Sequence, residues 1–276
     1  MGLVVGSFLN VVIHRLPRMM ERQWARDCQD WAGAPAEHAA PYNLAVPRSC
    51  CSHCAHPIHW YENVPLLSYV ALRGKCSACK APIGVRYPAV ELVTALFFVA
   101  AFAHFGLTLL ALAWCAFAAL LIALCMIDFD TQLLPDDLNY LLLWSGISVA
   151  LLGWGRIPVA SSLQGAIFGY LSLWSVTKLY YVLRGKVGMG NGDFKLLAAL
   201  GAWFGVEYLF ALILLSSLVG SVVGGLLLVA GRLAHRDIPI AFGPFLAGAG
   251  LLAMLMGPEK LQDWAPFAFP LGGLLR

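Results

Sequence analysis

The chain has 276 residues, of which 60% are apolar and only 12% are charged, and its formal net charge is +3. Soluble globular proteins are closer to half apolar and a quarter charged, so this composition argues against a soluble enzyme and favours a membrane protein. The small net charge gives no reason to expect a nucleic-acid partner.

Apolar stretches predict the helices in chain order. They cover residues 2–13, 88–105, 107–127, 138–154, 163–183, 194–205, 208–230 and 242–256. Several of them approach the roughly 20 residues that a helix needs to cross a bilayer core of about 30 Å. The sequence therefore predicts an all-α polytopic membrane protein with about eight transmembrane helices, surrounded by membrane lipid.

The first stretch is short for a complete span. Residues 2–13 give a helix of only about 18 Å at 1.5 Å per residue. Signal peptides have apolar regions of this length, but no basic stretch precedes this one and no small-residue cleavage pattern follows it. We interpret residues 1–13 as a shortened first transmembrane segment, and we expect the native protein to begin further upstream.

Lysine and arginine residues predict how the chain is oriented. They cluster at both ends of the segment 14–87 and recur after the fifth and seventh stretches, on the same side if every stretch crosses once. Basic residues mark the cytoplasmic side of a membrane protein. We therefore divide the chain into a first transmembrane segment, a cytoplasmic four-cysteine domain, a transmembrane bundle and a non-cytoplasmic tail, at residues 1–13, 14–87, 88–257 and 258–276.

The cytoplasmic segment contains two C-x-x-C motifs, formed by Cys51, Cys54, Cys76 and Cys79. Four thiolates in two tight turns are typical of a zinc-ribbon-like site, and four cysteines leave no open position, which indicates structural Zn²⁺. Reduced thiols or disulfides are the alternatives, although disulfides are rare on a cytoplasmic face. Three nearby histidines, His53, His56 and His59, are alternative ligands of lower weight.

Acidic residues are rare, and two groups of them lie at the predicted cytoplasmic side of the membrane. Asp128, Asp130, Asp136 and Asp137 follow the third stretch, and Asp193 follows the glycine-rich run 188–192. Asp193 could simply cap the next helix, as could Asp136 or Asp137. Asp128 ends a helix, where the helix dipole disfavours a negative charge, so we expect a partner carboxyl that shares a proton with it. Asp128 and Asp130 point about 200° apart on a helix, so only one of them pairs with Asp193, and spacing alone does not decide which.

Longer motifs resemble a known family along nearly the whole chain. They lie at residues 6–17, 61–65, 72–76, 86–91 and 242–245, together with the four cysteines and the two aspartate motifs. The chain resembles the bacterial type 4 prepilin leader peptidases, bifunctional enzymes that also N-methylate the cleaved product.

The resemblance implies an intramembrane aspartic protease of the GxGD type, with Asp128 and Asp193 as the catalytic pair. It implies a bacterial inner-membrane enzyme that cuts the short basic leader from type IV prepilins or type II secretion pseudopilins at the cytoplasmic face. S-adenosyl-L-methionine would supply the methyl group, at a site to which no residue is assigned. We further expect Asp130, Asp136 and Asp137 to form a negative rim that attracts the basic leader.

Two other functions compete with this interpretation. A transporter that relays protons through carboxylates would carry them near the bilayer centre, whereas these lie at the ends of predicted spans. A non-enzymatic zinc-binding assembly scaffold would need no carboxyl pair, so it predicts that substitutions of Asp128 are silent.

Overall fold

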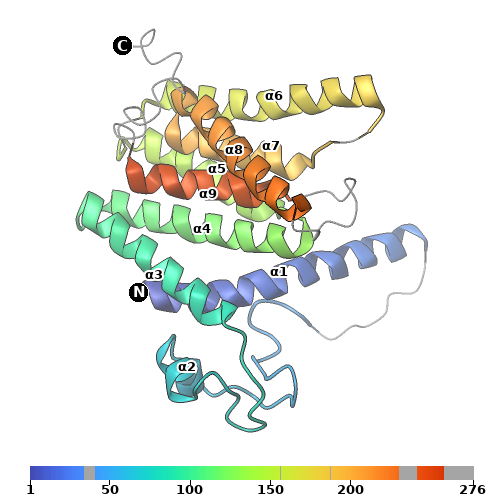
Figure 1. Ribbon diagram of the computed structural model, residues 1–276, viewed down its shortest axis with the longest axis vertical. Coiled ribbons are helices and arrows are strands. Elements are labelled where there is room, and N and C mark those ends of the chain that lie inside the picture. The colour runs from blue at the N-terminus through green and yellow to red at the C-terminus, as the bar shows by residue number, and fades with distance from the viewer. Residues whose placement is uncertain (34–40, 156, 187, 230–240, 258–276) are drawn as a thin grey trace. The chain divides into compact units, whose positions relative to one another are not determined.

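The structure is a computed structural model that describes residues 1–33, 41–155, 157–186, 188–229 and 241–257 (Figure 1). Regular structure in these ranges is helical, with two isolated β-bridges and no strand. The predicted tail 258–276 and most of the segment after the seventh stretch lie outside the described residues. The chain forms two compact units, Met1–Ala100 and Ala101–Arg276, and each is described by itself.

The first unit begins with a helix that is longer than the sequence predicts. Helix α1 spans Gly2–Trp31 and contains Pro17, whereas the apolar stretch ends at residue 13. Because proline normally predicts a helix end and the residues after 13 are polar, the extension carries no clear sequence signal. The expected boundary between residues 13 and 14 falls inside α1, as it would if the helix continues beyond the membrane surface.

Helix α3, Arg86–Phe105, packs closely against α1 through two glycines of α1. A Cβ atom on Gly6 would lie 2.6 Å from the Cα of Glu91, and one on Gly2 would lie 2.7 Å from the Cα of Ala95. Only glycine permits this backbone approach. In the chain, the 3₁₀ helix η1, Trp60–Asn63, and the short helix α2, Leu67–Ala71, follow α1 and precede α3.

Arg15 fixes the start of the four-cysteine loop to α1. Its guanidinium group is buried and donates hydrogen bonds of 2.7–3.2 Å to the carbonyl oxygens of Asn43, Leu44 and Pro47. A guanidinium group with several rigidly placed donors suits this task because it satisfies several carbonyls at once. A buried charged side chain therefore anchors the start of the loop.

The second unit contains the remaining helices, and they begin and end within a few residues of the predicted stretches. They are α4 (Leu109–Thr131), α5 (Asp136–Leu151), α6 (Val159–Arg184), α7 (Asn191–Phe204), η2 (Val206–Tyr208), α8 (Leu209–Val229) and α9 (Gly243–Met256). Thr108 caps α4 by accepting a hydrogen bond from the Ala111 N–H, and Gly185 ends α6 in a left-handed conformation. Both devices satisfy backbone groups at helix ends.

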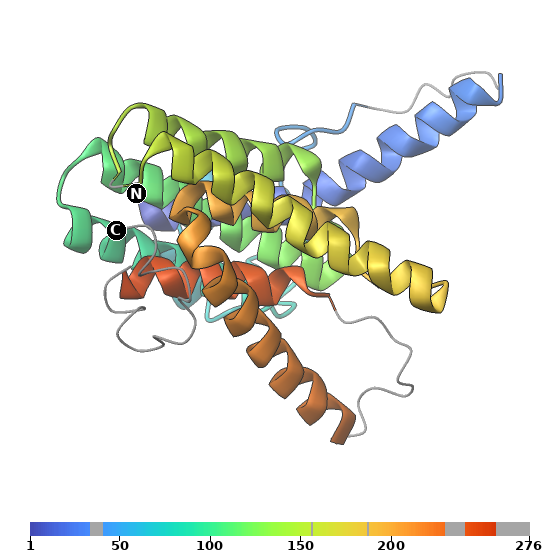
Figure 2. The same cartoon turned by 90° about the horizontal axis from the view of Figure 1, so that it is seen from above.

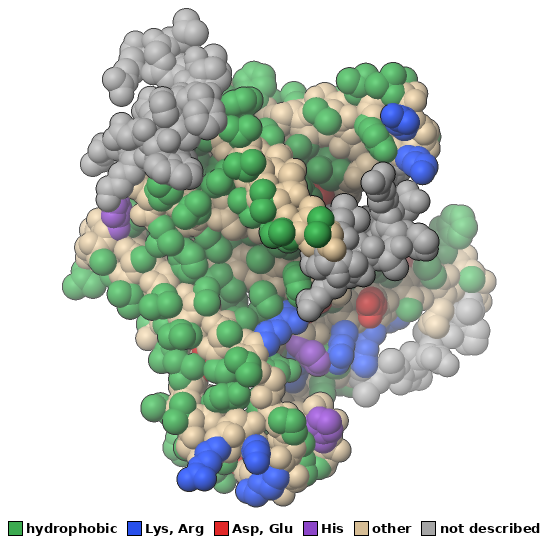
Figure 3. Space-filling view, viewed as in Figure 1, with side chains coloured by type: hydrophobic (Ala, Val, Ile, Leu, Met, Phe, Trp, Pro, Cys, Tyr) green, Lys and Arg blue, Asp and Glu red, His purple; other side chains and the backbone are tan. Residues whose placement is uncertain are grey.

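Three helical segments in the described ranges are long and apolar enough to cross a membrane: Arg86–Phe105, Leu109–Thr131 and Val206–Leu226. Helix α9 is apolar but shorter. Many large apolar side chains on the helices are exposed, and Figure 3 shows hydrophobic atoms over much of the visible helical surface. These features confirm a mostly helical membrane protein, while eight crossings stay a prediction.

Helix α7 lies in the middle of the second unit, in contact with α5, α6, α8 and α9 (Figure 2). All of its residues from Asp193 to Phe204 are buried except Lys195. A Cβ atom on Gly201 would collide with the carbonyl of Gly165 in α6, and the reverse substitution would collide as well. On the other side, the Trp203 Nε1–H donates a 2.9 Å hydrogen bond to the Leu142 carbonyl in α5. Backbone contact and a buried hydrogen bond thus fix α7 against its neighbours.

Candidate active site and metal centre

Asp128 and Asp193 meet where four segments of the second unit converge. Asp128 lies in the last turn of α4, and Asp193 is the third residue of α7. A Cβ atom on Gly243, the first residue of α9, would lie 2.5 Å from Asp128 Oδ2. Leu134, in the turn between α4 and α5, packs within 2.7 Å of a Cβ position on Gly192 and 3.2 Å of one on Gly243. The two glycines therefore let these segments close around the carboxyls.

The two carboxyls are buried and interact electrostatically. Asp128 is 4% exposed and Asp193 is 8% exposed, and the charge of Asp128 acts on Asp193. The N–H groups of Gly243 and Gly190 point to Asp128 and Asp193, respectively. Asp128 Oδ2 and Asp193 Oδ1 nevertheless have no hydrogen-bond partner. Neighbouring buried carboxyls favour a state that holds one proton between them, and their unpartnered oxygens are suited to bind a water molecule.

Helix capping explains only part of the position of Asp193. The N-cap of α7 is Gly190, and the Asp193 carboxyl receives the N–H of that residue, as an acidic residue at this position of a capping box does. If Asp193 only capped α7, it would not need a second buried carboxyl, that of Asp128, beside it. The N-cap of α5 is Pro135, so neither Asp136 nor Asp137 occupies the capping position.

Asp136 instead forms an ion pair with Lys195. The Lys195 Nζ donates to both carboxylate oxygens of Asp136 at 2.7 Å and lies 5.3 Å from the ring centroid of Tyr140. This pair joins the first turn of α5 to the second turn of α7, and Lys195 is two residues beyond Asp193. It also reduces the negative charge that Asp136 contributes to the expected rim for a basic leader. Asp130 is exposed, in contrast to the buried Asp128.

Asn139 is a polar residue of this unit that the sequence analysis did not single out. It is fully buried in α5, and both its Nδ2 and its Oδ1 lack a partner. In the described ranges, every buried side-chain oxygen or nitrogen without a partner belongs to Asp128, Asn139 or Asp193. The sequence could have pointed to Asn139, because it is an amide in an otherwise apolar stretch shortly after the acidic cluster. A buried amide of this kind calls for water or a ligand.

The first unit brings the four predicted cysteines together. The sulfur atoms of Cys51, Cys54, Cys76 and Cys79 all lie within 4.8 Å of one another, and those of Cys51 and Cys79 are 3.8 Å apart. A tetrahedron with metal–sulfur bonds of about 2.3 Å has edges of about 3.8 Å. The donor set therefore fits a metal ion bound by four thiolates.

The two cysteine turns share one backbone design. In the first, the Cys51 N–H donates to the His56 carbonyl and the Ala55 N–H donates to the Cys51 carbonyl. The second repeats both bonds with Cys76, Ala81 and Lys80, and Ala55 and Lys80 both have positive φ. The sequence shows why, because C-S-x-C-x-x-P-I occurs at residues 51–58 and again at 76–83. The sequence analysis missed this internal repeat.

Backbone N–H groups stabilise the thiolate form of one cysteine in each turn. The N–H groups of Cys54 and His53 lower the pKa of the Cys51 thiol to about 6. The N–H groups of Cys79 and Ala78 likewise lower the pKa of Cys76. Because the thiolate is the form that binds metals, backbone N–H groups in each turn favour the metal-binding form of one sulfur.

Known families match both units. The family model of the bacterial peptidase A24 N-terminal domain matches residues 1–105, and that of the type IV leader peptidase family matches residues 115–225. The second match includes both Asp128 and Asp193.

Several curated proteins are similar over almost the whole chain. A prepilin leader peptidase/N-methyltransferase of Aeromonas hydrophila is 52% identical over 95% of this chain and 90% of its own length. Proteins with the same name from Pseudomonas aeruginosa and Burkholderia pseudomallei are 51% and 47% identical, over 97% and 99% of this chain and 92% and 86% of their own lengths. No solved structure matches the chain.

Proposed function

Because the chain belongs to the type IV leader peptidase family, we propose that it removes the leader peptide from prepilins and methylates the new N-terminus. The resemblance seen in the sequence motifs is thereby confirmed. The observation that carries the assignment of the hydrolytic site is the meeting of two buried carboxyls, Asp128 and Asp193, with unpartnered oxygens. Precursors of type IV pilins and of type II secretion pseudopilins are the proposed substrates.

The proposed hydrolysis divides the work between the two carboxyls. The ionised carboxylate takes a proton from a water molecule, and the resulting hydroxide forms a bond to the carbonyl carbon of the scissile peptide. The protonated carboxyl donates a hydrogen bond to the carbonyl oxygen, and the proton taken from water then passes to the leaving amine as the C–N bond breaks.

Co-expression with a prepilin tests this proposal directly. We expect the wild-type chain to shorten the precursor, seen as faster migration on a gel and as a new N-terminus by mass spectrometry. A non-enzymatic scaffold or a carboxylate-relay transporter predicts an unchanged precursor. The position of Asp128 and Asp193 at helix ends, rather than within helices, also favours the peptidase over the relay.

A methyl group from S-adenosyl-L-methionine completes the second reaction. Hydrolysis needs the carboxyl pair, whereas methyl transfer needs a methyl donor next to the new amine. We therefore expect membranes depleted of S-adenosylmethionine to cleave the prepilin at an unchanged rate and to leave its N-terminus unmethylated, as read by intact mass. Loss of cleavage after depletion would contradict two independent reactions, and adding the cofactor back provides the control.

Zn²⁺ is the proposed ion for the four-cysteine site, with a structural role. Cys51→Ser removes one thiolate from a closed site whose metal stabilises the loop. We expect this variant to lose zinc, measured by elemental analysis of the purified protein, and to become more sensitive to proteolysis within residues 41–85. Cys28→Ser is the matched control, because Cys28 lies exposed on α1 and does not belong to the four-cysteine group. Full zinc content in Cys51→Ser would contradict the assignment.

We also propose eight crossings of the bacterial inner membrane, with the carboxyl pair at the cytoplasmic face. In intact cells, a cysteine in place of Arg184, the last residue of α6, should resist a thiol reagent confined to the periplasm. A cysteine in place of Leu107, the exposed residue between α3 and α4, should be labelled. The reverse pattern would overturn this orientation.

A further inference from the structure

A second group of side chains with metal-ligating atoms close together lies in the four-cysteine loop. His56, His59 and Glu62 each present a ligand atom, and these atoms lie within 4.8 Å of one another. The His56 Nε2 is 3.6 Å from Glu62 Oε2, and the two imidazole rings are 5.7 Å apart between centroids. The Glu62 side chain is only 10% exposed. Three donors of this kind, two imidazoles and a carboxylate, suit a divalent transition metal.

The cysteine turn itself does not require the imidazole of His56. In the internal repeat, His56 corresponds to Ala81, and the carbonyl oxygens of both residues accept the N–H of the first cysteine of their turn. Alanine performs this backbone task as well as histidine does. The side chain of His56 is therefore available for a role that the second turn lacks.

Glu62 is held in place by two hydrogen bonds. The Ser77 hydroxyl donates to its carboxylate. The His59 N–H donates to Oε2 at 2.9 Å in the capping box of η1, in which the His59 side chain in turn accepts the Glu62 N–H. Outer hydrogen bonds of this type orient carboxylate ligands in metal sites.

We propose that His56, His59 and Glu62 bind a second divalent transition-metal ion, of the class of Zn²⁺. A tetrahedral ion with nitrogen and oxygen bonds of about 2.0–2.2 Å places its ligand atoms about 3.4 Å apart, close to the 3.6 Å between His56 and Glu62. Three protein ligands leave at least one position open to water, unlike the closed four-thiolate site. This site is independent of the proposed peptidase activity.

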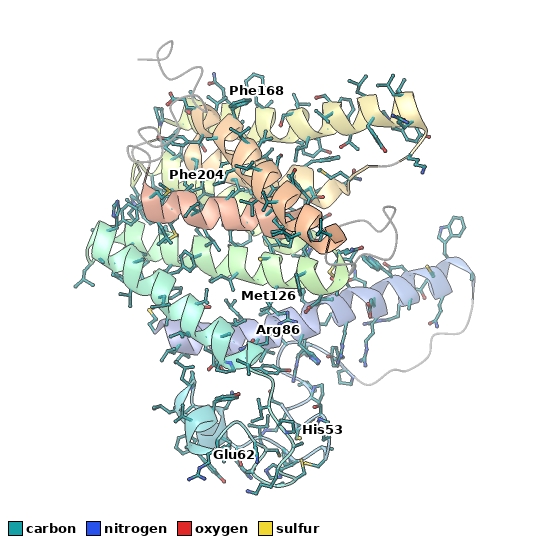
Figure 4. All side chains as sticks on the ribbon, viewed as in Figure 1. His53, Glu62, Arg86, Met126, Phe168 and Phe204 are labelled. Atoms are coloured by element: carbon teal, nitrogen blue, oxygen red, sulfur yellow. The ribbon has the colours of Figure 1, made fainter. Side chains whose placement is uncertain are left out.

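The test is the zinc content of the full chain, purified without a histidine tag and dialysed at a buffered, low free Zn²⁺ concentration. We expect two zinc ions per chain in the wild type and one in His56→Ala and Glu62→Gln. Glutamine keeps a carbonyl oxygen that accepts the same hydrogen bonds but removes the charge. His53→Ala is the control and should keep two ions, because His53 is outside the group; Figure 4 labels it apart from Glu62 in this loop.

Cobalt substitution identifies which ion is lost. Thiolate-to-cobalt absorption bands should remain unchanged in Glu62→Gln while the total cobalt falls by one ion per chain. One zinc per wild-type chain, or a second ion that appears only at excess free zinc, would show that no specific second site exists. Loss of both ions in Glu62→Gln would mean that Glu62 only supports the cysteine turns, and it would also overturn the proposal.

Discussion

Replacing either Asp128 or Asp193 by asparagine should abolish prepilin cleavage while leaving the protein folded in the membrane. Asparagine keeps the size of the side chain and most of its hydrogen bonds, so a capping role survives. It cannot take a proton from water or share one with a partner carboxyl. General acid–base catalysis contributes about 100- to 10,000-fold, and we expect at least this loss in the initial cleavage rate at matched protein levels.

The double variant should be no worse than either single variant, because residues that act as a unit have non-additive effects. Asp130→Asn and Asp137→Asn are the matched controls, since both side chains lie exposed in the same segment. We expect them to lower the affinity for the basic leader at most. Substantial activity in Asp193→Asn would end the aspartic-protease assignment. Activity that is lost in Asp130→Asn but kept in Asp128→Asn would move the first catalytic residue by two positions.

Gly243→Ala should inactivate the enzyme without unfolding it. The new methyl group would lie 2.5 Å from Asp128 Oδ2 and 3.0 Å from its Cγ, closer than such atoms approach, so the carboxyl has to turn away. A displacement of about 1 Å in a catalytic group is enough for a loss of about 100-fold. The measurement is the prepilin cleavage rate, with thermal stability in detergent recorded alongside it.

Gly248→Ala, in the same helix, separates this effect from a general change in α9. A Cβ atom on Gly248 has no neighbour within 4 Å, so we expect wild-type cleavage and equal or higher stability. Wild-type activity in Gly243→Ala would show that the position of the Asp128 carboxyl is not critical. Unfolding of Gly243→Ala alone would place the role of this glycine in packing.

The sequence predicted the helices of the second unit well because each coincides with a long apolar stretch bounded by turn residues. It underestimated α1, where the polar residues after 13 and Pro17 gave no sign that the helix continues to Trp31. Burial distinguishes two aspartates that helical direction left equal, although it does not test which of them is catalytic. Asp128 and Asp130 were equal candidates by spacing, and the structure buries the first and exposes the second.

Contacts between segments that are distant in the chain could not be predicted from the sequence. The ion pair of Lys195 with Asp136 joins residues 59 positions apart, and no local pattern announces it. Asn139 is one amide in an apolar stretch, and its lack of partners is visible only when its neighbours are known. The repeat around the four cysteines was readable, but only by comparing the two C-x-x-C segments beyond their cysteines.

The close contact of α6 and α7 at Gly165 and Gly201 indicates which helices stay in place when a substrate enters the candidate active site. Separating α7 from α6 or α5 would break direct backbone packing, the Trp203 hydrogen bond and the Lys195 ion pair. Asp193 therefore belongs to a stationary wall. An extended peptide that enters between the carboxyls has to displace α4 and α9, whose contact with α7 includes the packing of Leu200 on Gly250. We therefore expect Asp128 to move with α4 when a substrate enters, so that a covalent tether between α4 and α7 should block prepilin cleavage.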